Sequence, residues 1–253
     1  MSIDACAALV ARSDPDRFAA VMAMPLALRA KMLVLYAFNL EVARAPWASK
    51  EPLICEMRLQ WWRDIVAEPK PRAHEVAAPL HALIHEHQLP LPVFDQLIAA
   101  RSWDIYTDPF VDDLALDMYL DHSAGGLMWL AALLAGAGPS AEPAVRGFGH
   151  AVGLAAYLRA VPELEQRGKR PLVDGRPDAV RALASHGLAQ LAAARKERRL
   201  VGEAGRALLV GWQAEGILRQ VVENPLRVAQ GELGLSEFHK RGGLLMATLL
   251  GRW

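Results

Sequence analysis

The chain lacks the features that identify several common classes of protein. Its 253 residues include only two cysteines, Cys6 and Cys55, which lie far apart and predict no disulfide framework. No run of about 18 uninterrupted apolar residues occurs, so the sequence predicts no transmembrane helix. The N-terminus carries Asp4 and no long apolar run, unlike a secretory signal. These absences favour a reducing compartment, and we expect a cytoplasmic protein.

An excess of charge of either sign is also lacking. Lys and Arg together number 28, as do Asp and Glu, so the net charge is zero with neutral histidines. A nucleic-acid-binding protein needs a basic surface, and we therefore expect no nucleic acid partner. The sequence contains no P-loop, no GxSxG and no CxxC, so the usual nucleotide, hydrolase and zinc sites find no support.

What the chain does contain is a helical pattern along almost its whole length. Alanine and leucine dominate, and β-branched residues are sparse. The pattern predicts helices over 4–12, 14–22, 26–44, 50–68, 75–87, 92–105, 111–136, 142–160, 177–199, 204–223 and 236–250. No linker, low-complexity stretch or repeat interrupts this pattern, so we expect a single domain over residues 1–253.

Two of these segments predict a thick bundle. Segment 26–44 is apolar nearly all round, and the same holds for 127–135. A helix that is apolar on every face lies inside a protein rather than on its surface. Several buried helices predict an all-α bundle, not a two-layer domain.

Two motifs resemble the signatures of the squalene/phytoene synthase family. Leu35–Trp47 resembles its first signature helix, in which YAF is followed by the magnesium-binding cluster DDxxD. Gly153–Pro171 resembles the second signature, LxNxLRDVxEDxxRGRxYLP, with Leu158, Arg159 and Val161 among the residues in register. The resemblance spans roughly 20–240. It implies a helical bundle of the isoprenoid (terpenoid) synthase type, in which 26–44 and 142–160 face each other across a central cavity.

Further positions match the family between and around these motifs. Arg29 stands where the family has an arginine seven residues before its tyrosine, here Tyr36. Asp104 occupies the aspartate position of the family's GM..D segment, and Tyr119 belongs to the helix that lines the family's cavity. Segment 56–64 resembles its WR-containing helix.

The acidic residues of both family motifs are largely replaced. Family members join two prenyl diphosphates, and magnesium held by the two aspartate clusters draws off the diphosphate. The corresponding positions here are Ala43, Arg44, Trp47, Ala160, Glu163 and Leu164, of which only Glu163 keeps an acid. The resemblance therefore implies no intact catalytic site and no cofactor; magnesium is expected only if the chain is nevertheless an enzyme.

The same cavity has candidates for binding without a metal. We expect the cavity or an anion site to be lined by Arg29, Tyr36, Asn39, Arg44, Asp104, Tyr119, Arg159, Glu163 and Arg167. Arginine suits bidentate contacts to phosphate, so four arginines at one end of the cavity predict direct diphosphate binding. The alternative is that these arginines are surface or packing charges left from an ancestral site.

Within the family, the motifs YAFN.E.A, LRA.P and EMRLQWW resemble those of one branch, that of mitochondrial complex I assembly factor 6 and its bacterial relatives. This resemblance implies a non-catalytic assembly or binding factor whose partner is a respiratory-complex subunit. The protein would then lie at the inner face of the membrane, on the matrix side in a eukaryote. Two alternatives are a prenyl transferase that joins two prenyl diphosphates and an isoprenoid or lipid carrier.

Two further segments each have two interpretations. The basic run 195–199 suits contact with anionic lipid headgroups. Alternatively, it is the end of a helix, where positive side chains interact favourably with the helix dipole. The tail 240–250 places an apolar patch behind Lys240 and Arg241. It fits a peripheral contact with a membrane interface or docking onto the bundle.

Overall fold

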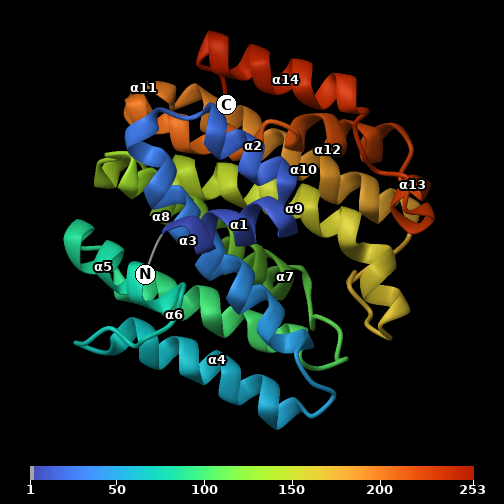
Figure 1. Ribbon diagram of the computed structural model, residues 1–253. Helices are drawn as coiled ribbons and strands as arrows, with labels where there is room; N and C mark the ends of the chain where they lie inside the picture. Colours follow the sequence, from blue (N-terminus) through green and yellow to red (C-terminus); the bar gives the residue numbers. More distant parts are fainter. Residues whose placement is uncertain (1–2) are drawn as a thin grey trace.

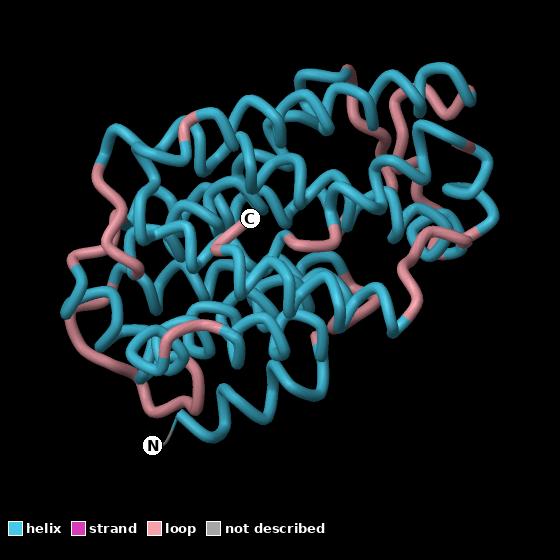
Figure 2. The backbone as a smooth tube through the Cα atoms, turned by 90° about the horizontal axis from the view of Figure 1, so that it is seen from above, coloured by secondary structure: helices cyan, strands magenta, loops and turns pink. Residues whose placement is uncertain are grey.

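The computed structural model describes residues 3–253, and every regular element among them is a helix (Figures 1 and 2). The α-helices are α1 (Ile3–Ser13), α2 (Pro15–Ala23), α3 (Leu26–Arg44), α4 (Pro52–Ala67), α5 (Ala77–His87), α6 (Leu91–Ala100), α7 (Asp113–Leu120), α8 (Gly126–Leu134), α9 (Glu142–Gln166), α10 (Pro177–Lys196), α11 (Arg198–Val201), α12 (Ala214–Glu223), α13 (Leu226–Gln230) and α14 (Glu237–Leu250). Short 3₁₀ segments are η1 (Ala45–Trp47), η2 (Arg101–Asp104), η4 (Pro139–Ala141) and η5 (Gly202–Gly211). A π-helical segment, η3, covers Asp121–Gly125. The predicted all-α bundle is confirmed.

The helices are arranged as stacked layers. Figure 1 shows α4 at one edge, then α5 and α6, and in the centre α3, α7, α8 and α9. Beyond them lie α10 and α12, and α14 forms the opposite edge. None of the helices in residues 3–253 combines the length and the apolar character needed to cross a bilayer.

Helix α3 is buried along its second half, as its apolar sequence predicts. Tyr36 and Phe38 are at most 1% exposed. Phe38 packs edge-on against Trp62 of α4 and Phe94 of α6, with ring centroids 5.5 and 5.4 Å apart. The first turn of the helix differs, because Leu26 and Ala27 are exposed there. Helix α3 therefore connects the outer layer of α4 and α6 with the centre of the bundle.

The predicted helix 111–136 is divided into α7, η3 and α8. The division lies where α9 comes closest: a Cβ built on Gly153 would meet the Cβ of Ala124 at 2.3 Å. A Cβ on Gly149 would meet the Cβ of Met128 at 2.6 Å. These glycines let the two backbones approach, and the π-helical turn lies at their contact. Such turns often accompany functional sites.

Other boundaries differ from the predictions for local reasons. The helix predicted over 142–160 continues to Gln166, although Pro162 removes one backbone hydrogen bond inside it. The first half of the segment predicted as 204–223 is 3₁₀ rather than α-helical. Helix α13 was not predicted, because it is a single short turn after Pro225.

Candidate functional site

A cavity of about 370 Å³ lies in the centre of the bundle. Helix α3 contributes Tyr36, Asn39 and Ala43 to one wall, and α9 contributes a row of residues that includes Ala156 and Ala160 to the facing wall. The predicted arrangement of these two helices across a cavity is therefore confirmed. On α3 the lining residues recur every three or four positions, as one face of a helix requires.

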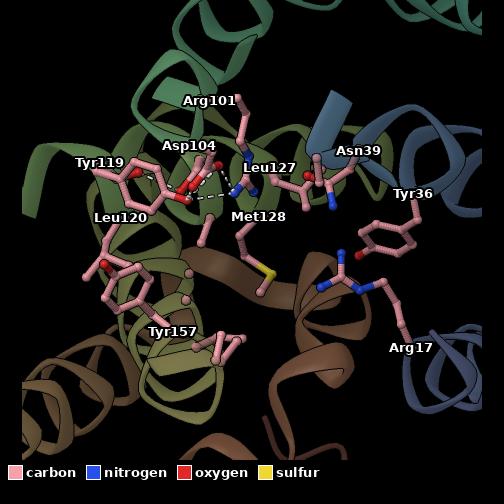
Figure 3. A pocket seen from close by; sticks show the side chains of 18 of the residues that line it. Arg17, Tyr36, Asn39, Arg101, Asp104, Tyr119, Leu120, Leu127, Met128 and Tyr157 are labelled. Carbon is pink, nitrogen blue, oxygen red and sulfur yellow. Dashed lines mark hydrogen bonds and ion pairs between the residues drawn. The ribbon is translucent and has the colours of Figure 1, made fainter. Parts of the chain in front are cut away.

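Most of the cavity surface between its polar ends is apolar. Leu120, Leu127 and Met128 line it from α7 and α8, and Val152 and Val210 complete it. Figure 3 shows Met128 between two polar groups, with Tyr119 and Arg101 on one side and Tyr36 and Arg17 on the other. The cavity thus has an apolar middle and two polar ends.

The aspartate-motif positions of the family lie at this cavity. Ala43, Trp47, Ala160 and Leu164 all line it, and none of these side chains carries a carboxylate. Arg44 is turned away from it: its guanidinium donates a hydrogen bond to Ser13 Oγ of α1. Because Arg44 follows Ala43 directly, it points about 100° further round the helix.

Glu163, the remaining acid of the motifs, is paired. Its carboxylate accepts a hydrogen bond of 2.6 Å from Arg167 Nη2. The guanidinium of Arg167 in turn lies over the ring of Trp47, 4.4 Å from its centroid. An arginine cation and an indole thus stand at the aspartate-motif positions of the family. The cation repels a metal ion, and the indole offers it no oxygen ligand.

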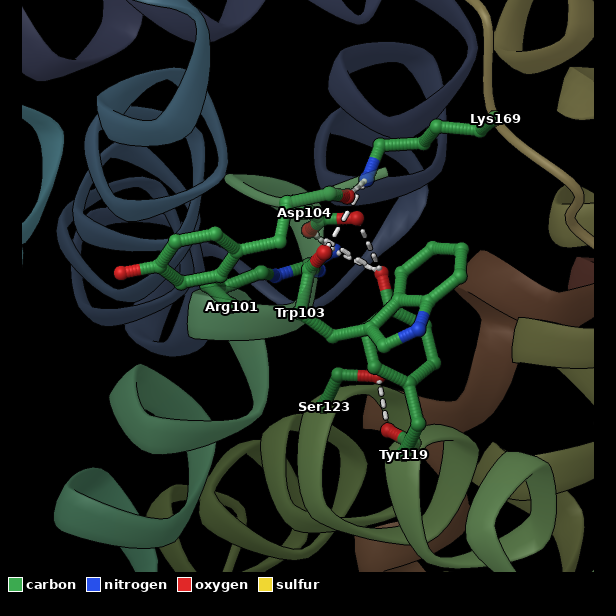
Figure 4. A network of polar contacts seen from close by, with 7 residues as sticks. Arg101, Trp103, Asp104, Tyr119, Ser123 and Lys169 are labelled. Carbon is green, nitrogen blue, oxygen red and sulfur yellow. Dashed lines mark hydrogen bonds and ion pairs between the residues drawn. The ribbon is translucent and has the colours of Figure 1, made fainter. Parts of the chain in front are cut away.

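Asp104 belongs to a buried network at one end of the cavity (Figure 4). Arg101 Nη1 donates to Asp104 Oδ2 at 3.3 Å and to the hydroxyl of Tyr119 at 2.8 Å. The Tyr119 hydroxyl donates to Asp104 at 3.1 Å. Burial by itself would lower the pKa of Arg101. Tyr119 and Asp104 beside it outweigh this effect and hold the pKa of Arg101 above its ordinary value. Burial also raises the pKa of Tyr119, which stays protonated at neutral pH.

These carboxylates do not fit a magnesium cluster. Magnesium needs several free oxygen ligands in octahedral geometry. Glu163 is bound to Arg167, and Asp104 is bound to Arg101 and Tyr119. Among residues 3–253 no group of three or more His, Cys, Asp or Glu side chains is arranged to hold a metal ion.

Lys169 closes the network from the loop after α9. Its ammonium donates to the carbonyl oxygens of Trp103, at 3.0 Å, and of Tyr106. It lies 4.3 Å from the centroid of the Trp103 ring (Figure 4). Burial lowers the pKa of Lys169, although Asp104 and Asp108 act in the opposite direction. Lys169 joins the second family motif to η2, which positions Asp104.

The other end of the cavity holds polar atoms without partners. The Tyr36 hydroxyl and Asn39 Oδ1 are buried and make no hydrogen bond within residues 3–253. Arg17 of α2 lies over the Tyr36 ring, 4.8 Å from its centroid. Burial raises the pKa of Tyr36 to about 12, so its hydroxyl remains a hydrogen-bond donor at neutral pH. Unpartnered polar groups are costly, so these two atoms mark a place for a ligand or ordered water.

The predicted cavity residues divide into two groups. Those that line the cavity are Tyr36, Asn39, Asp104, Tyr119, Glu163 and Arg167. Arg29, Arg44 and Arg159 do not, so the predicted cluster of four arginines is not assembled. Arg29 Nε donates to the carbonyl of Met24, and the side chain of Arg159 is exposed.

Sequence reasoning missed several residues of the site. Arg17, Arg101 and Tyr157 line the cavity, and Lys169 supports it. The Tyr157 hydroxyl donates to the carbonyl of Pro171 at 2.8 Å, which fixes its ring in the wall. Arg101 precedes Asp104 by three residues, a spacing that brings two helical side chains together. This spacing could have predicted that Arg101 belongs to the site. Arg17 comes from another helix and carried no signal.

Comparisons with known proteins agree with this geometry. The family model for squalene/phytoene synthase matches residues 10–172. The chain is 27% identical over 195 residues to a Drosophila melanogaster protein named NADH dehydrogenase (ubiquinone) complex I, assembly factor 6 homolog, covering 73% of this chain and 56% of that protein. It is 24% identical over 168 residues to the Homo sapiens assembly factor 6, covering 65% and 50%. The chain spans about half the length of the curated relatives it matches.

Solved structures share the fold. A dehydrosqualene synthase superposes with a TM-score of 0.79 at 14% identity, over 98% of this chain and 95% of the other. Squalene synthase HpnC from Alicyclobacillus acidocaldarius gives 0.71 at 19% identity, over 92% and 95%. At these identities the likeness establishes the fold alone.

Proposed function

Because this chain belongs to the squalene/phytoene synthase family, we propose its function from the state of that family's cavity: it is a non-catalytic member that acts as an assembly or binding factor. One observation carries the proposal. Ala43, Trp47, Ala160 and Leu164 line the cavity at the aspartate positions and offer no carboxylate oxygen.

The physical chemistry of the family's reaction supports this interpretation. Loss of diphosphate from a prenyl chain develops a large negative charge, which metal ions neutralise in the active enzymes. Here the neighbouring charges are Arg167 and Lys169, held by Glu163 and by backbone carbonyls. Neither is free to follow a leaving group without breaking its contacts. We therefore propose that the cavity binds no magnesium and that the protein does not join prenyl diphosphates. This disfavours the alternative function, a prenyl transferase.

The proposed partner is a subunit of a respiratory complex. Sequence similarity to the assembly factor 6 branch supports it: curated proteins of that name match 62–73% of the chain. The proposed location is accordingly the cytoplasm or, in a eukaryote, the mitochondrial matrix, beside the membrane that holds the complex.

The unpartnered atoms in the cavity favour a second candidate, an isoprenoid or lipid carrier. The Tyr36 hydroxyl and Asn39 Oδ1 offer one donor and one acceptor at the end of an apolar space. This pair suits the head of a neutral molecule such as a prenyl alcohol better than a diphosphate. The two candidates are compatible, because a bound apolar chain can stabilise a factor that acts through its surface.

Deleting the gene in its native host is expected to lower the amount of assembled complex I. Native gel electrophoresis with an NADH dehydrogenase activity stain measures this loss. The wild-type gene should restore the complex, and so should Glu163→Gln, which removes the last acid of the metal motifs. Normal complex I in the deletion strain would refute the assembly role. Failure of a well-expressed Glu163→Gln variant would show that this acid still serves a site.

A further inference from the structure

Helix α14 presents an apolar stripe to solvent. Phe238, Leu245 and Leu249 are 83, 59 and 70% exposed. They are separated by seven and four residues, so they lie along one side of the helix, and we call them the α14 stripe. Met246 and Leu250 extend it and are also exposed. No residue of α14 is buried.

The opposite side of α14 attaches the helix to the bundle. Trp212 Nε1 donates to the carbonyl of Lys240 at 3.2 Å, and Lys240 Nζ lies 3.3 Å from Asp16 Oδ2 of α2. Ala247 packs against the core. Figure 1 shows α14 as the outermost helix on its side of the molecule. The helix is thus held in place by one face while its stripe faces away from the protein.

Basic side chains surround the stripe. Arg241 and Arg252 are exposed on α14 and just after it, and α11 brings Arg198 and Arg199. Arg198 Nη2 donates to the carbonyl of Gly251 at 3.2 Å, which places α11 beside the end of α14. Segments 196–206 and 237–252 together carry seven Lys and Arg against three Glu. A chain with no net charge therefore concentrates positive charge at this edge.

We propose that α14 and α11 form a surface that binds the headgroup region of an anionic membrane. A helix that lies in the interface inserts its apolar side among the acyl chains and places basic residues among the phosphates. The α14 stripe and its basic rim supply these two elements. Charge decides against a second copy of this chain as the occupant, because pairing two such surfaces would bring like charges together.

A second exposed apolar stripe on the same protein differs from the α14 stripe in the charge around it. Val111, just before α7, and Leu114 and Met118, on α7, are 88, 65 and 50% exposed. Segment 106–118 carries four aspartates and no basic residue. An anionic membrane repels it, although its apolar exposure is similar. The α7 stripe therefore provides a matched control.

Sedimentation with lipid vesicles tests the proposal. The wild-type chain should bind vesicles of equal parts phosphatidylcholine and phosphatidylglycerol, and should bind pure phosphatidylcholine vesicles much less. The double substitution Leu245→Glu with Leu249→Glu should lower binding at least about tenfold, whereas Leu114→Glu with Met118→Glu should leave it unchanged. Replacing Arg199 and Arg241 by Gln should lower binding about fivefold for each charge, and added salt should lower wild-type binding.

All these substitutions are at exposed positions, and circular dichroism of each variant checks that the fold is kept. Equal loss of binding in both Glu pairs would overturn the proposal, as would equal binding to neutral and anionic vesicles. Absence of vesicle binding would also overturn it. If sedimentation velocity then showed a dimer that Leu245→Glu with Leu249→Glu dissociates, the stripe would belong to a contact between copies instead.

Discussion

Placing aspartate at Ala43, Trp47, Ala160 and Leu164 together is expected to create magnesium-dependent diphosphate binding. The four side chains line one cavity from two facing helices, so carboxylates there would converge. Arg44 is left unchanged, because it contacts Ser13 outside the cavity. Four acids in a largely apolar space repel one another, and each costs about 1–3 kcal/mol without a partner. The apo variant should therefore melt at least about 10 °C lower than the wild type.

Melting temperatures measured with magnesium and inorganic pyrophosphate provide the readout. The variant should recover part of its lost stability, by about 2.7 kcal/mol at a ligand concentration 100 times the dissociation constant. A matched variant with asparagine at the same four positions has nearly the same shape but no negative charge, and it should gain nothing. A wild-type protein that gains as much as the aspartate variant would show that the site was never lost.

Asp104→Asn is expected to destabilise the protein by about 3–5 kcal/mol, because it leaves the charge of Arg101 in a largely buried place without its partner. The side chains of Asp104 and Arg101 are 5 and 19% exposed. The change also alters the hydrogen bond from the Tyr119 hydroxyl, which now meets an amide. Urea unfolding followed by circular dichroism measures the difference in the free energy of unfolding.

Glu163→Gln is the matched control for that measurement. Glu163 also pairs with an arginine at the same cavity, but the side chains of Glu163 and Arg167 are 66 and 43% exposed. An exposed pair contributes about 1 kcal/mol or less. If the two substitutions had equal effects, the Asp104 network would not have the structural role inferred from its burial.

The sequence predicted the frame of this site because its strongest signals come from buried helices. Tyr36 and Phe38 lie in a segment that is apolar on all faces, and a helix of this kind is buried in the centre of a bundle. The facing of Ala43 and Ala160 was implied by the resemblance of their two motifs to the family signatures, and both residues line the cavity. The division of 111–136 was not predictable, because its cause is the contact of Gly149 and Gly153 with another helix.

The polar ends of the cavity were harder to predict. A single sequence shows which arginines are near a motif, but not which way they turn. Arg44 is adjacent to a lining residue and faces outward, whereas Arg17 lies in a different helix and faces inward. Both outcomes depend on how α1 and α2 pack against α3. Within residues 3–253 the Tyr36 hydroxyl and Asn39 Oδ1 make no hydrogen bond, and this too depends on the assembled cavity.

Calorimetric titration of the wild-type protein with geranylgeranyl diphosphate, with and without magnesium, tests the central proposal most directly. The cavity residues predict no binding that depends on magnesium, because no set of free carboxylates faces the ligand. A parallel titration with the neutral alcohol geranylgeraniol tests the carrier. Metal-independent binding of the alcohol that Tyr36→Phe weakens would support that role. Tight binding of the diphosphate only in the presence of magnesium would contradict the non-catalytic function.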